Sequence, residues 1–420
     1  MKTVGLLSNL NEYVDNKILY SAYRNAVDFL ITEDKEILNK SLKLNIKDKV
    51  LSIDEALELF NDYAPKNPYA PPSIKAEYVY NLNIKDHFFD SLKKEYPNFE
   101  KWFEKISREG RRCLVYFLND NKIGALLIYK IEEEAINSIP PLPKEKRLKL
   151  CTFKVEHEGY KIGELFIKWS VHFCVKNKIY EIYLTHFTKE NDKLVELISR
   201  YGFTRKASFQ GGEDIYVKRL IPEDKTKLNL NPIQIASTYY PTFYDGLDVK
   251  KFIIPILPKY HDRLFTDFFL RQSEIPEFTG DLIIEGNTIK KAYLCHSKVK
   301  NINPGDIIIF YRSKDLKALT SLGTVEKAYY EQNNINKIMQ LIEKRTVYTI
   351  KEVEKMSKKP LTIILFNFHF HLSNPINLET MRKMRILSTA PRTIYKISHK
   401  KYLLIKSKCG IDARYTINQT

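Results

Sequence analysis

The alternation of apolar and polar positions is clearest in the middle of the chain. Apolar runs at 112–120, 122–132, 149–156 and 181–187 have the length and the β-branched and aromatic content of strands. Several stretches between and after them carry apolar residues at the three- and four-residue spacing of amphipathic helices. This pattern predicts an α/β or α+β fold, with a mixed sheet and flanking helices.

The C-terminal part has a different pattern, in which strand-like runs are bounded by turn residues. Such runs occupy 305–313, 320–330, 361–372 and 401–407, with few helical stretches between them. The pattern predicts a small β-barrel or a strongly bent sheet.

Two polar segments that contain proline divide the chain. Residues 61–73 include four prolines, and residues 220–234 follow an apparent closing strand. We therefore expect a small α/β segment over 1–64, an α/β domain over 74–222, a linker over 223–245 and a β-rich domain over 246–420.

The net charge of the 420-residue chain is +17, and it is unevenly distributed. Residues 246–420 hold 30 Lys and Arg against 16 Asp and Glu, whereas residues 1–64 hold 8 against 11. The C-terminal block is therefore where we expect a polyanion such as nucleic acid to bind. The alternative is a Lys-rich surface that only keeps the protein soluble.

The five cysteines are scattered and form no C-x-x-C pair. We therefore expect no metal site, no disulfide framework and a cytoplasmic location. The longest apolar runs fall short of a membrane span, so no membrane association is expected.

A glycine-punctuated turn follows the strand-like run that ends at Val155. Gly159 and Gly163 open a stretch whose apolar residues, beginning with Ile162 and Leu165, fall at helical spacing. Free backbone N–H groups at a helix N-terminus favour an anion, and glycines let a ligand approach closely. The residues leave three interpretations open, namely a phosphate, a nucleotide, or a tight turn without a ligand.

The stretch 150–207 resembles the GNAT (Gcn5-related) N-acetyltransferase family. The matching features are a strand, the glycine turn, a long helix, the strand IYLTHF, Asn191, a second helix and the sequence YGF before a closing strand. The hairpin at 111–132 fits the preceding strands, so the resemblance covers about residues 74–220. It implies acetyl-CoA as the cofactor and a pyrophosphate loop at 158–163. The cofactor-binding residues that it implies are Phe153, Lys154 and Val155 on the strand edge, Gly159, Tyr160, Lys161, Ile162, Gly163 and Glu164 in the pyrophosphate cradle, and Thr185 and Asn191 on the far side of the pantetheine.

Several positions depart from the family pattern. Glu158 stands where Arg or Gln is usual, and Lys161 replaces the middle glycine. Ile198 stands where the family often has a tyrosine general acid, and Tyr183 and Tyr201 are the candidate replacements by position. The candidate general bases are Glu134, Glu156 and His157, and the alternative for each is a solvated side chain.

Residues 15–60 have the pattern of a helix, a strand, a helix, a strand and a helix. With Asp15 beginning a helix and Asp34 following a strand, the segment resembles the C-terminal half of a PIN-type ribonuclease domain. Two carboxylates at one sheet edge could hold Mg²⁺ or Mn²⁺, but the first half of such a domain, with its further acids, has no counterpart. We therefore expect a structural segment, or one that docks a protein partner, without nuclease activity.

The turn Pro304-Gly305-Asp306 leads into a strand that ends in Tyr311-Arg312-Ser313. This arrangement is similar to the PUA-like superfamily, which includes the ASCH and EVE domains that bind RNA or modified bases. It implies an RNA cleft over 246–420, with aromatic side chains that stack on bases, and residues 381–401 add seven Lys and Arg for phosphates. The alternative is a core tyrosine and a solubilising surface. The implied RNA-binding residues are His296, Tyr311, Arg312 and Ser313 in the cleft and Arg382, Lys383, Arg385 and Arg392 in the basic run.

His369 and His371 would share one face of a strand and could ligate a metal. Because no third ligand of defined spacing accompanies them, we expect core histidines.

These features together predict an acetyl-CoA-dependent N-acetyltransferase that acts on an amine of RNA by direct transfer. tRNA or aminoacyl-tRNA is the favoured acceptor, as in the toxin-type members of the GNAT family. The alternatives are a protein N-acetyltransferase tethered to nucleic acid and a non-catalytic RNA-binding regulator.

Overall fold

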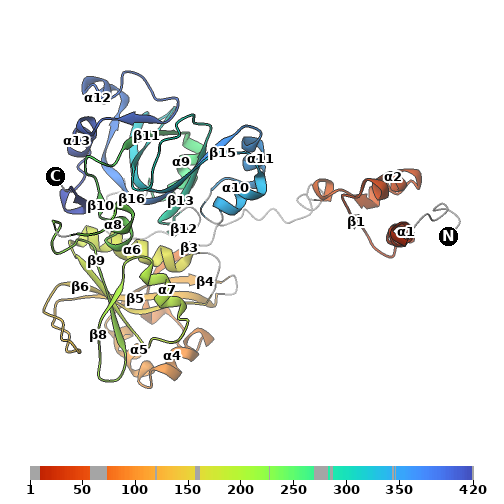
Figure 1. Cartoon of the computed structure of the whole chain (residues 1–420). Helices are drawn as coiled ribbons and strands as arrows, with labels where there is room; N and C mark the ends of the chain where they lie inside the picture. Colours follow the sequence, from red (N-terminus) through yellow and green to blue (C-terminus); the bar gives the residue numbers. More distant parts are fainter. Residues whose placement is uncertain are drawn as a thin grey trace. The chain divides into compact units, whose positions relative to one another are not determined.

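The computed structural model describes residues 10–56, 73–118, 121–156, 161–226, 228–268, 282–283, 287–342, 345 and 347–418. The chain divides into two compact units, Met1–Ala70 and Pro71–Thr420, which we call unit 1 and unit 2. The elements of both are labelled in Figure 1.

Unit 1 is built on two helices and a short parallel strand pair. Helices α1 (Leu10–Tyr23) and α2 (Lys35–Lys43) accompany strands β1 (Leu30–Ile31) and β2 (Val50–Leu51), and a 3₁₀ turn covers Lys47–Lys49. These four elements follow the order expected from the sequence, and of the fifth, a helix, only residues 53–56 are described. Its small core consists of Leu19, Ala22, Ile37, Ile46 and Val50.

The candidate metal-binding carboxylates of unit 1 lie on its helices. Asp34 caps α2, where its Oδ1 atom accepts hydrogen bonds from the N–H groups of Glu36 at 2.8 Å and Ile37 at 3.1 Å. Asp15 lies in α1. Within the described residues, no cluster of three or more His, Cys, Asp or Glu side chains could hold a metal ion. The geometry therefore gives Asp34 a capping role.

The N-terminal part of unit 2 is an eight-stranded sheet in the order β12-β3-β4-β5-β6-β7-β9-β8. Neighbouring strands run antiparallel except β6 and β7, which are parallel. The expected α/β fold with a mixed sheet is therefore confirmed. The strands are β3 (Ser73–Tyr78), β4 (Arg112–Phe117), β5 (Ile123–Glu132), β6 (Arg147–Val155), β7 (Glu181–His186), β8 (Thr204–Ser208), β9 (Asp214–Arg219) and β12 (Leu282–Ile283).

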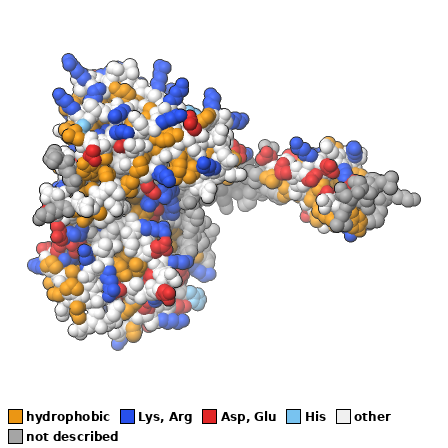
Figure 2. Space-filling view, viewed as in Figure 1, with side chains coloured by type: hydrophobic (Ala, Val, Ile, Leu, Met, Phe, Trp, Pro, Cys, Tyr) orange, Lys and Arg blue, Asp and Glu red, His pale blue; other side chains and the backbone are white. Residues whose placement is uncertain are grey.

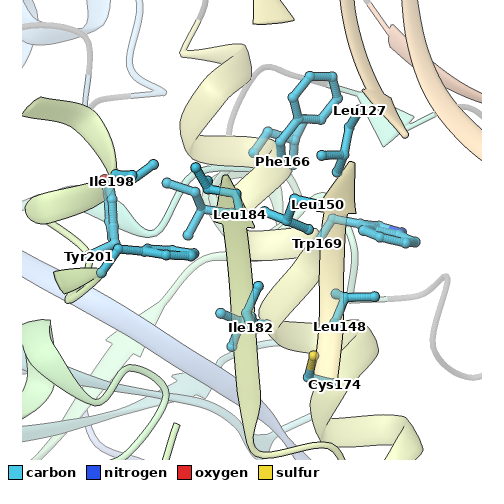
Figure 3. Packing of buried hydrophobic residues seen from close by; sticks show 14 of the residues in the cluster. Leu127, Leu148, Leu150, Phe166, Trp169, Cys174, Ile182, Leu184, Ile198 and Tyr201 are labelled. Carbon is cyan, nitrogen blue, oxygen red and sulfur yellow. The ribbon is translucent and has the colours of Figure 1, made fainter. Parts of the chain in front are cut away.

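Helices cover both faces of this sheet. Helices α6 (Ile162–Asn177) and α7 (Lys193–Ser199) pack on one face, and the close-up in Figure 3 shows Phe166 and Trp169 of α6 against Leu148, Leu150 and Leu184. On the other face lie α4 (Asp90–Glu95) and α5 (Phe99–Arg108), with 3₁₀ turns at Val79–Asn81 and His87–Phe89. Strands buried on both faces explain the almost continuous apolar runs of β4 and β5.

The C-terminal part of unit 2 centres on a six-stranded sheet in the order β13-β16-β15-β14-β11-β17. Only the β11–β14 pair within it is parallel. Strands β10 (Phe243–Tyr244) and β18 (Thr416–Ile417) form a separate, short parallel pair. In the sequence, β10 precedes the strands of the six-stranded sheet and β18 follows them. The strands of the six-stranded sheet are β11 (Lys251–Ile256), β13 (Lys290–Cys295), β14 (Ile307–Arg312), β15 (Ala318–Gln332), β16 (Leu361–Asn377) and β17 (Tyr395–Ile397).

More helices accompany this sheet than the sequence pattern suggested. The strand expected at 401–407 is part of helix α13, which buries Tyr402, Ile405 and Cys409 at helical spacing behind the cap residue Ser398. The apolar residues of this segment are spaced for a helix, so the strand prediction was wrong. The helices are α8 (Pro232–Thr238), α9 (Pro258–Leu264), α10 (Ile335–Ile342), α11 (Ile350–Ser357), α12 (Leu378–Lys383) and α13 (His399–Lys408), with a 3₁₀ turn at Ala413–Tyr415.

The segment expected to be a linker, 223–245, is packed between the two parts of unit 2. It forms α8 and β10, and the hydroxyl of Thr242 donates to the carbonyl of Leu220 at 2.7 Å. A Cβ on Gly202 would lie 2.0 Å from the carbonyl oxygen of Thr238, so the two segments touch at backbone level. Strand β12 also extends the eight-stranded sheet through β3. Among the described residues, no helix has the length and apolar content to cross a membrane.

Candidate functional site

The parallel strands β6 and β7 separate halfway along their length. Residues 147–150 pair with residues 181–184, and beyond that point the described part of β6 pairs with β5 alone. A register shift against β5 leaves Cys151 as the extra residue of a bulge at the point of separation. A gap between two strands of a sheet is an unusual feature, and it opens directly before helix α6.

The free edge of β6 directs backbone groups into this gap. The N–H of Glu156 donates to the carbonyl of Gly124 at 3.0 Å. Because antiparallel ladders alternate, the backbone groups of Lys154 then face β5, whereas those of Phe153 and Val155 face the gap. The edge therefore offers donors and acceptors to an extended ligand. The side chain of Lys154 is turned to the 3₁₀ turn at His87–Phe89, with its Nζ over the ring of Phe88 at 4.4 Å.

A cavity of about 1160 Å³ opens at the gap. Its walls come from α4 and α5, from β5 to β7, from α6 and α7, and, in the C-terminal part, from Lys290 and Arg345. Of the predicted site residues it brings together Phe153, Lys154, Val155, Lys161, Ile162, Gly163, Glu164, Thr185 and Tyr201.

The described residues that line the cavity include eleven Lys and Arg but only four Glu. Arg111 pairs with Glu109 at 2.6 Å, and Lys189 pairs with Glu95 at 2.7 Å. The excess of cations favours an anionic ligand. The cations are Lys105, Arg111, Lys130, Lys149, Lys154, Lys161, Lys189, Lys193, Arg200, Lys290 and Arg345.

The start of helix α6 forms one end of the cavity. Lys161 adopts left-handed backbone angles (φ 54°, ψ 28°) and precedes the first residue of the helix. A Cβ on Gly163 would lie 2.5 Å from Cδ2 of Leu197, so this glycine permits close packing of α6 on α7. The predicted loop residues His157, Glu158, Gly159 and Tyr160 lie outside the described residues.

Glu164, expected in the pyrophosphate cradle, has a different set of contacts. Its Oε1 atom accepts hydrogen bonds from the backbone N–H groups of Ile289 at 2.7 Å and Lys290 at 2.9 Å. The carboxylate is therefore turned toward the C-terminal part and shielded by it. The two N–H donors partly offset the negative charge of this carboxylate at the first turn of α6. No local pattern signals this contact, because the two partners lie 125 and 126 residues away along the chain.

The two candidate tyrosines lie in different places. Tyr201 is buried and lines the cavity, and burial together with the neighbouring Glu164 carboxylate raises the pKa of its phenol well above the usual value. Tyr183 lies in a separate cluster on the opposite face of the sheet, where its hydroxyl bonds Glu132. Ile198 is fully buried in the core between α7 and the sheet, as Figure 3 shows. Of these two candidates only Tyr201 therefore lines the cavity, and Tyr96, which follows α4, is a second tyrosine in its wall.

The predicted general bases Glu134 and Glu156, and Asn191, which was expected beside the pantetheine, do not line the cavity. Glu134 is exposed on the loop after β5, and Glu156 forms an ion pair with Lys154 at 2.6 Å. Asn191 is exposed, with a left-handed φ of 55°. None of these three is among the described residues that line the cavity.

Sequence reasoning missed a histidine at the end of β7. His186 lines the cavity, and its Nε2 atom lies 2.6 Å from Oδ2 of Asp192, the cap residue of α7. A signal was present, because a strand that ends in histidine precedes an Asn-Asp pair by five residues.

Two of the four cleft residues predicted for the C-terminal part are buried. Tyr311 is fully buried in a hydrophobic cluster. Arg312 is 4% exposed and contacts Asp262, Asp315 and Nδ1 of His261. Neither side chain is presented to a base, because β14 is covered on both faces. Ser313 donates to the carbonyl of Ile256 at 3.0 Å, and His296 is exposed with Nδ1 3.3 Å from the carbonyl oxygen of Pro360.

The predicted basic run lies on the surface around α12 and β17. Arg382, Lys383, Arg385 and Arg392 are exposed, and Lys383 pairs with Glu379 at 2.8 Å. Figure 2 shows Lys and Arg side chains over the α12 end of unit 2. We call this region the α12–β17 surface, and its members are Arg382, Arg385, Arg392, Tyr395 and Lys396.

His369 and His371 are buried, and each contacts protein groups through both ring nitrogens. Nδ1 of His369 lies 3.0 Å from the carbonyl of Pro241, and its Nε2 lies 2.7 Å from Thr324. His371 lies 3.0 Å from Asp267, which also pairs with Lys168 of α6 at 3.2 Å. These contacts join α6 to the C-terminal part through a second polar connection.

Comparison with solved structures finds two kinds of similar protein, namely an ASCH protein and GNAT-family acetyltransferases. No family model matches the chain, and no curated protein matches it. An ASCH protein of Zymomonas mobilis is 12% identical and is matched over 38% of this chain and 94% of its own, with a TM-score of 0.29. A GNAT N-acetyltransferase of Escherichia coli in complex with CoA is 13% identical over 36% of this chain and 82% of its own, with a TM-score of 0.26.

A GNAT-family acetyltransferase of Listeria monocytogenes is 16% identical over 31% of this chain and 76% of its own, with a TM-score of 0.23. Each is a resemblance of one part of this chain. The PIN-like interpretation of residues 1–64 stays a prediction.

Proposed function

We propose that unit 2 is an acyl-CoA-dependent N-acyltransferase that uses acetyl-CoA as its donor. The observation that carries the proposal is the separation of β6 from β7 at a cavity rich in cations. An extended pantetheine arm suits the free edge at Phe153 and Val155, and the phosphates of CoA suit the start of α6 with its surrounding Lys and Arg. The cavity volume suits a ligand of this size.

The residues of the cavity supply what direct transfer needs. Acetyl-CoA, when bound, supplies a thioester whose carbonyl carbon an amine can attack, so that a C–N bond forms and the C–S bond breaks. Tyr201 keeps its proton at neutral pH because its pKa is raised, so its hydroxyl can donate a hydrogen bond to the sulfur, which leaves as a thiolate when the C–S bond breaks. His186, oriented by Asp192, is the histidine placed to accept the proton of the amine.

The proposed acceptor is an amine carried by RNA, with tRNA or aminoacyl-tRNA favoured. The support is the charge of residues 246–420 and the exposed cations and tyrosine of the α12–β17 surface. A protein amine is the alternative acceptor, with the same surface serving as a nucleic-acid tether.

A transfer assay with labelled acetyl-CoA tests both parts of the proposal. Charged tRNA, uncharged tRNA and total cell protein are offered in parallel to the protein and to a Gly163→Asp variant. The variant adds a carboxylate at the first turn of α6 and must displace Leu197. Label in an RNA pool that the variant fails to produce is the expected result. Label in protein alone contradicts the acceptor, and no label in any pool contradicts the activity.

The proposed role of unit 1 is to dock a protein partner. Nine of its large hydrophobic side chains are exposed, although only 47 of its residues are described. A two-stranded sheet is also marginal by itself, so added contacts would stabilise it. The exposed side chains are Val14, Ile18, Tyr20, Tyr23, Val27, Phe29, Ile31, Leu42 and Ile53.

A further inference from the structure

Two of the cations in the cavity come from the C-terminal part. Lys290 is the first residue of β13, and Arg345 lies between α10 and α11. Both reach the side of the cavity where α6 begins. The backbone N–H of Lys290 donates to Glu164, and Arg345 lies near enough to Tyr201 that its charge opposes the rise in the pKa of that phenol.

One carboxylate holds both cations. Oε2 of Glu326 lies 3.0 Å from Nη1 of Arg345 and 3.9 Å from Nζ of Lys290. The side chains of Arg345 and Lys290 are 21% and 29% exposed, so they are partly desolvated and restricted. Two positive charges against one negative charge leave the group positive, and Glu326 itself is not among the described residues that line the cavity.

We propose that Lys290 and Arg345 bind phosphate groups of the nucleotide donor, so that the C-terminal part completes the donor site. The inference rests on the function proposed above. The planar guanidinium of Arg345 offers paired N–H donors to phosphate oxygens, and Lys290 adds a point charge. Lys193 and Arg200 of the α7 region line the same cavity, so cations from both parts of unit 2 surround one space.

This arrangement gives the C-terminal part a role beyond RNA binding. The backbone N–H of Lys290 in β13 donates a hydrogen bond to the carboxylate of Glu164 in α6. Both residues also line the cavity. Donor binding and the packing of the two parts are therefore coupled through the same few residues.

Calorimetric titration with CoA tests the proposal. We expect Arg345→Ala and Lys290→Ala each to weaken CoA binding about tenfold, since each removes a charge-assisted contact. A parallel titration with 3′-dephospho-CoA distinguishes the source of the phosphate. If the 3′-phosphate is the bound group, wild type and variants bind dephospho-CoA alike; if it is the pyrophosphate, the tenfold loss persists. Both results support the proposal.

Two further variants serve as controls. Glu326→Gln removes the competing carboxylate while keeping both cations, and we expect it to bind CoA more tightly; weaker binding would count against the proposal. Lys355→Ala removes an exposed cation of α11 that is not among the described residues lining the cavity, and it should leave CoA affinity unchanged. Thermal unfolding of every variant checks that it is folded, and Lys290→Met or Arg345→Met replaces the alanine variant at the same position if that variant is not.

The failures of the two proposals are distinguishable. If wild type binds CoA and both alanine variants bind it with the same affinity, the inference about Lys290 and Arg345 is overturned while the proposed donor stands. If wild type does not bind CoA, the proposed function is overturned as well.

Discussion

The cations of the cavity and those of the α12–β17 surface are held in different ways. In the cavity, Arg345 and Lys290 share Glu326, and each is less than one-third exposed. On the surface, Arg385, Arg392 and Lys396 are exposed and form no recorded ion pair with the described part of the chain. The first group is positioned by its surroundings, whereas the second is free to adapt.

This difference indicates two kinds of anionic ligand. Preorganised, half-buried cations suit a small ligand with phosphates at fixed positions, because little side-chain entropy is lost on binding. Exposed cations beside a half-exposed tyrosine suit a flexible polyanion, whose affinity comes from counterion release and base stacking. If the proposed function holds, the positive charge of unit 2 therefore serves two purposes.

The largest expected effect tests whether the chemistry belongs to the cavity. Tyr201→Phe should lower kcat about 100-fold or more while leaving CoA affinity near that of wild type, because it removes a hydrogen-bond donor to the leaving sulfur and little volume. Steady-state kinetics combined with a CoA titration measures both quantities.

Tyr183→Phe is the matched control, since this tyrosine lies on the opposite face of the sheet. It should change kcat by less than about threefold. Equal losses in the two variants would contradict the assignment of Tyr201.

The next effect concerns the surface alone. A triple variant, Arg385→Ala, Arg392→Ala and Lys396→Ala, should weaken tRNA binding about tenfold or more and reduce the slope of log affinity against log salt by about 2 to 3. Filter binding at several salt concentrations measures this. An unchanged slope would show that these cations do not contact phosphates.

Lys218 differs from the cations of both the cavity and the α12–β17 surface, because its side chain is fully buried. Its Nζ donates to the carbonyl of Thr238 at 3.0 Å, and burial lowers its pKa to about 7. The unfolded chain, with an ordinary lysine pKa, then binds more protons between pH 7 and about 10, so the free energy of unfolding rises with pH by up to about 1.4 kcal/mol per unit.

Lys218→Met removes this dependence. The thermal unfolding midpoint of wild type relative to the variant should therefore rise as the pH increases from 7 to 9. Parallel pH profiles for the two proteins would contradict a buried lysine that is neutral at high pH.

The smallest expected effect comes from unit 1. Deletion of residues 1–70 should leave CoA affinity and kcat within about twofold of the full chain, because unit 2 has its own cores and its cavity is lined by its own residues. A large loss of CoA affinity in the shortened protein would contradict an accessory role for unit 1.

The elements that depend on local sequence patterns were predictable from the sequence. The runs of β4 to β7 and the helix that follows the glycine turn are local patterns, and they placed Phe153, Val155 and Tyr201 near one site. The strand prediction at 401–407 failed because Tyr402 and Ile405 are also spaced for a helix, and the cap at Ser398 was not weighed.

The rest depends on contacts between distant segments. Glu164 meets Ile289 and Lys290 only after the two parts of unit 2 have packed together. Tyr311 and Arg312 had the composition of a binding cleft, but β14 is central in its sheet and is covered on both faces. Sequence gives residue type and spacing, whereas burial on a central strand is decided by the tertiary fold.

A paired titration tests the division between the two cationic regions most directly. CoA and tRNA are each titrated into wild type, into Arg345→Ala and into the triple surface variant. We expect Arg345→Ala to lose about tenfold in CoA affinity and keep its tRNA affinity, and the triple variant to show the reverse. If either variant weakens both ligands equally, or if Arg345→Ala weakens only tRNA, the two regions do not have separate ligands and the account is contradicted.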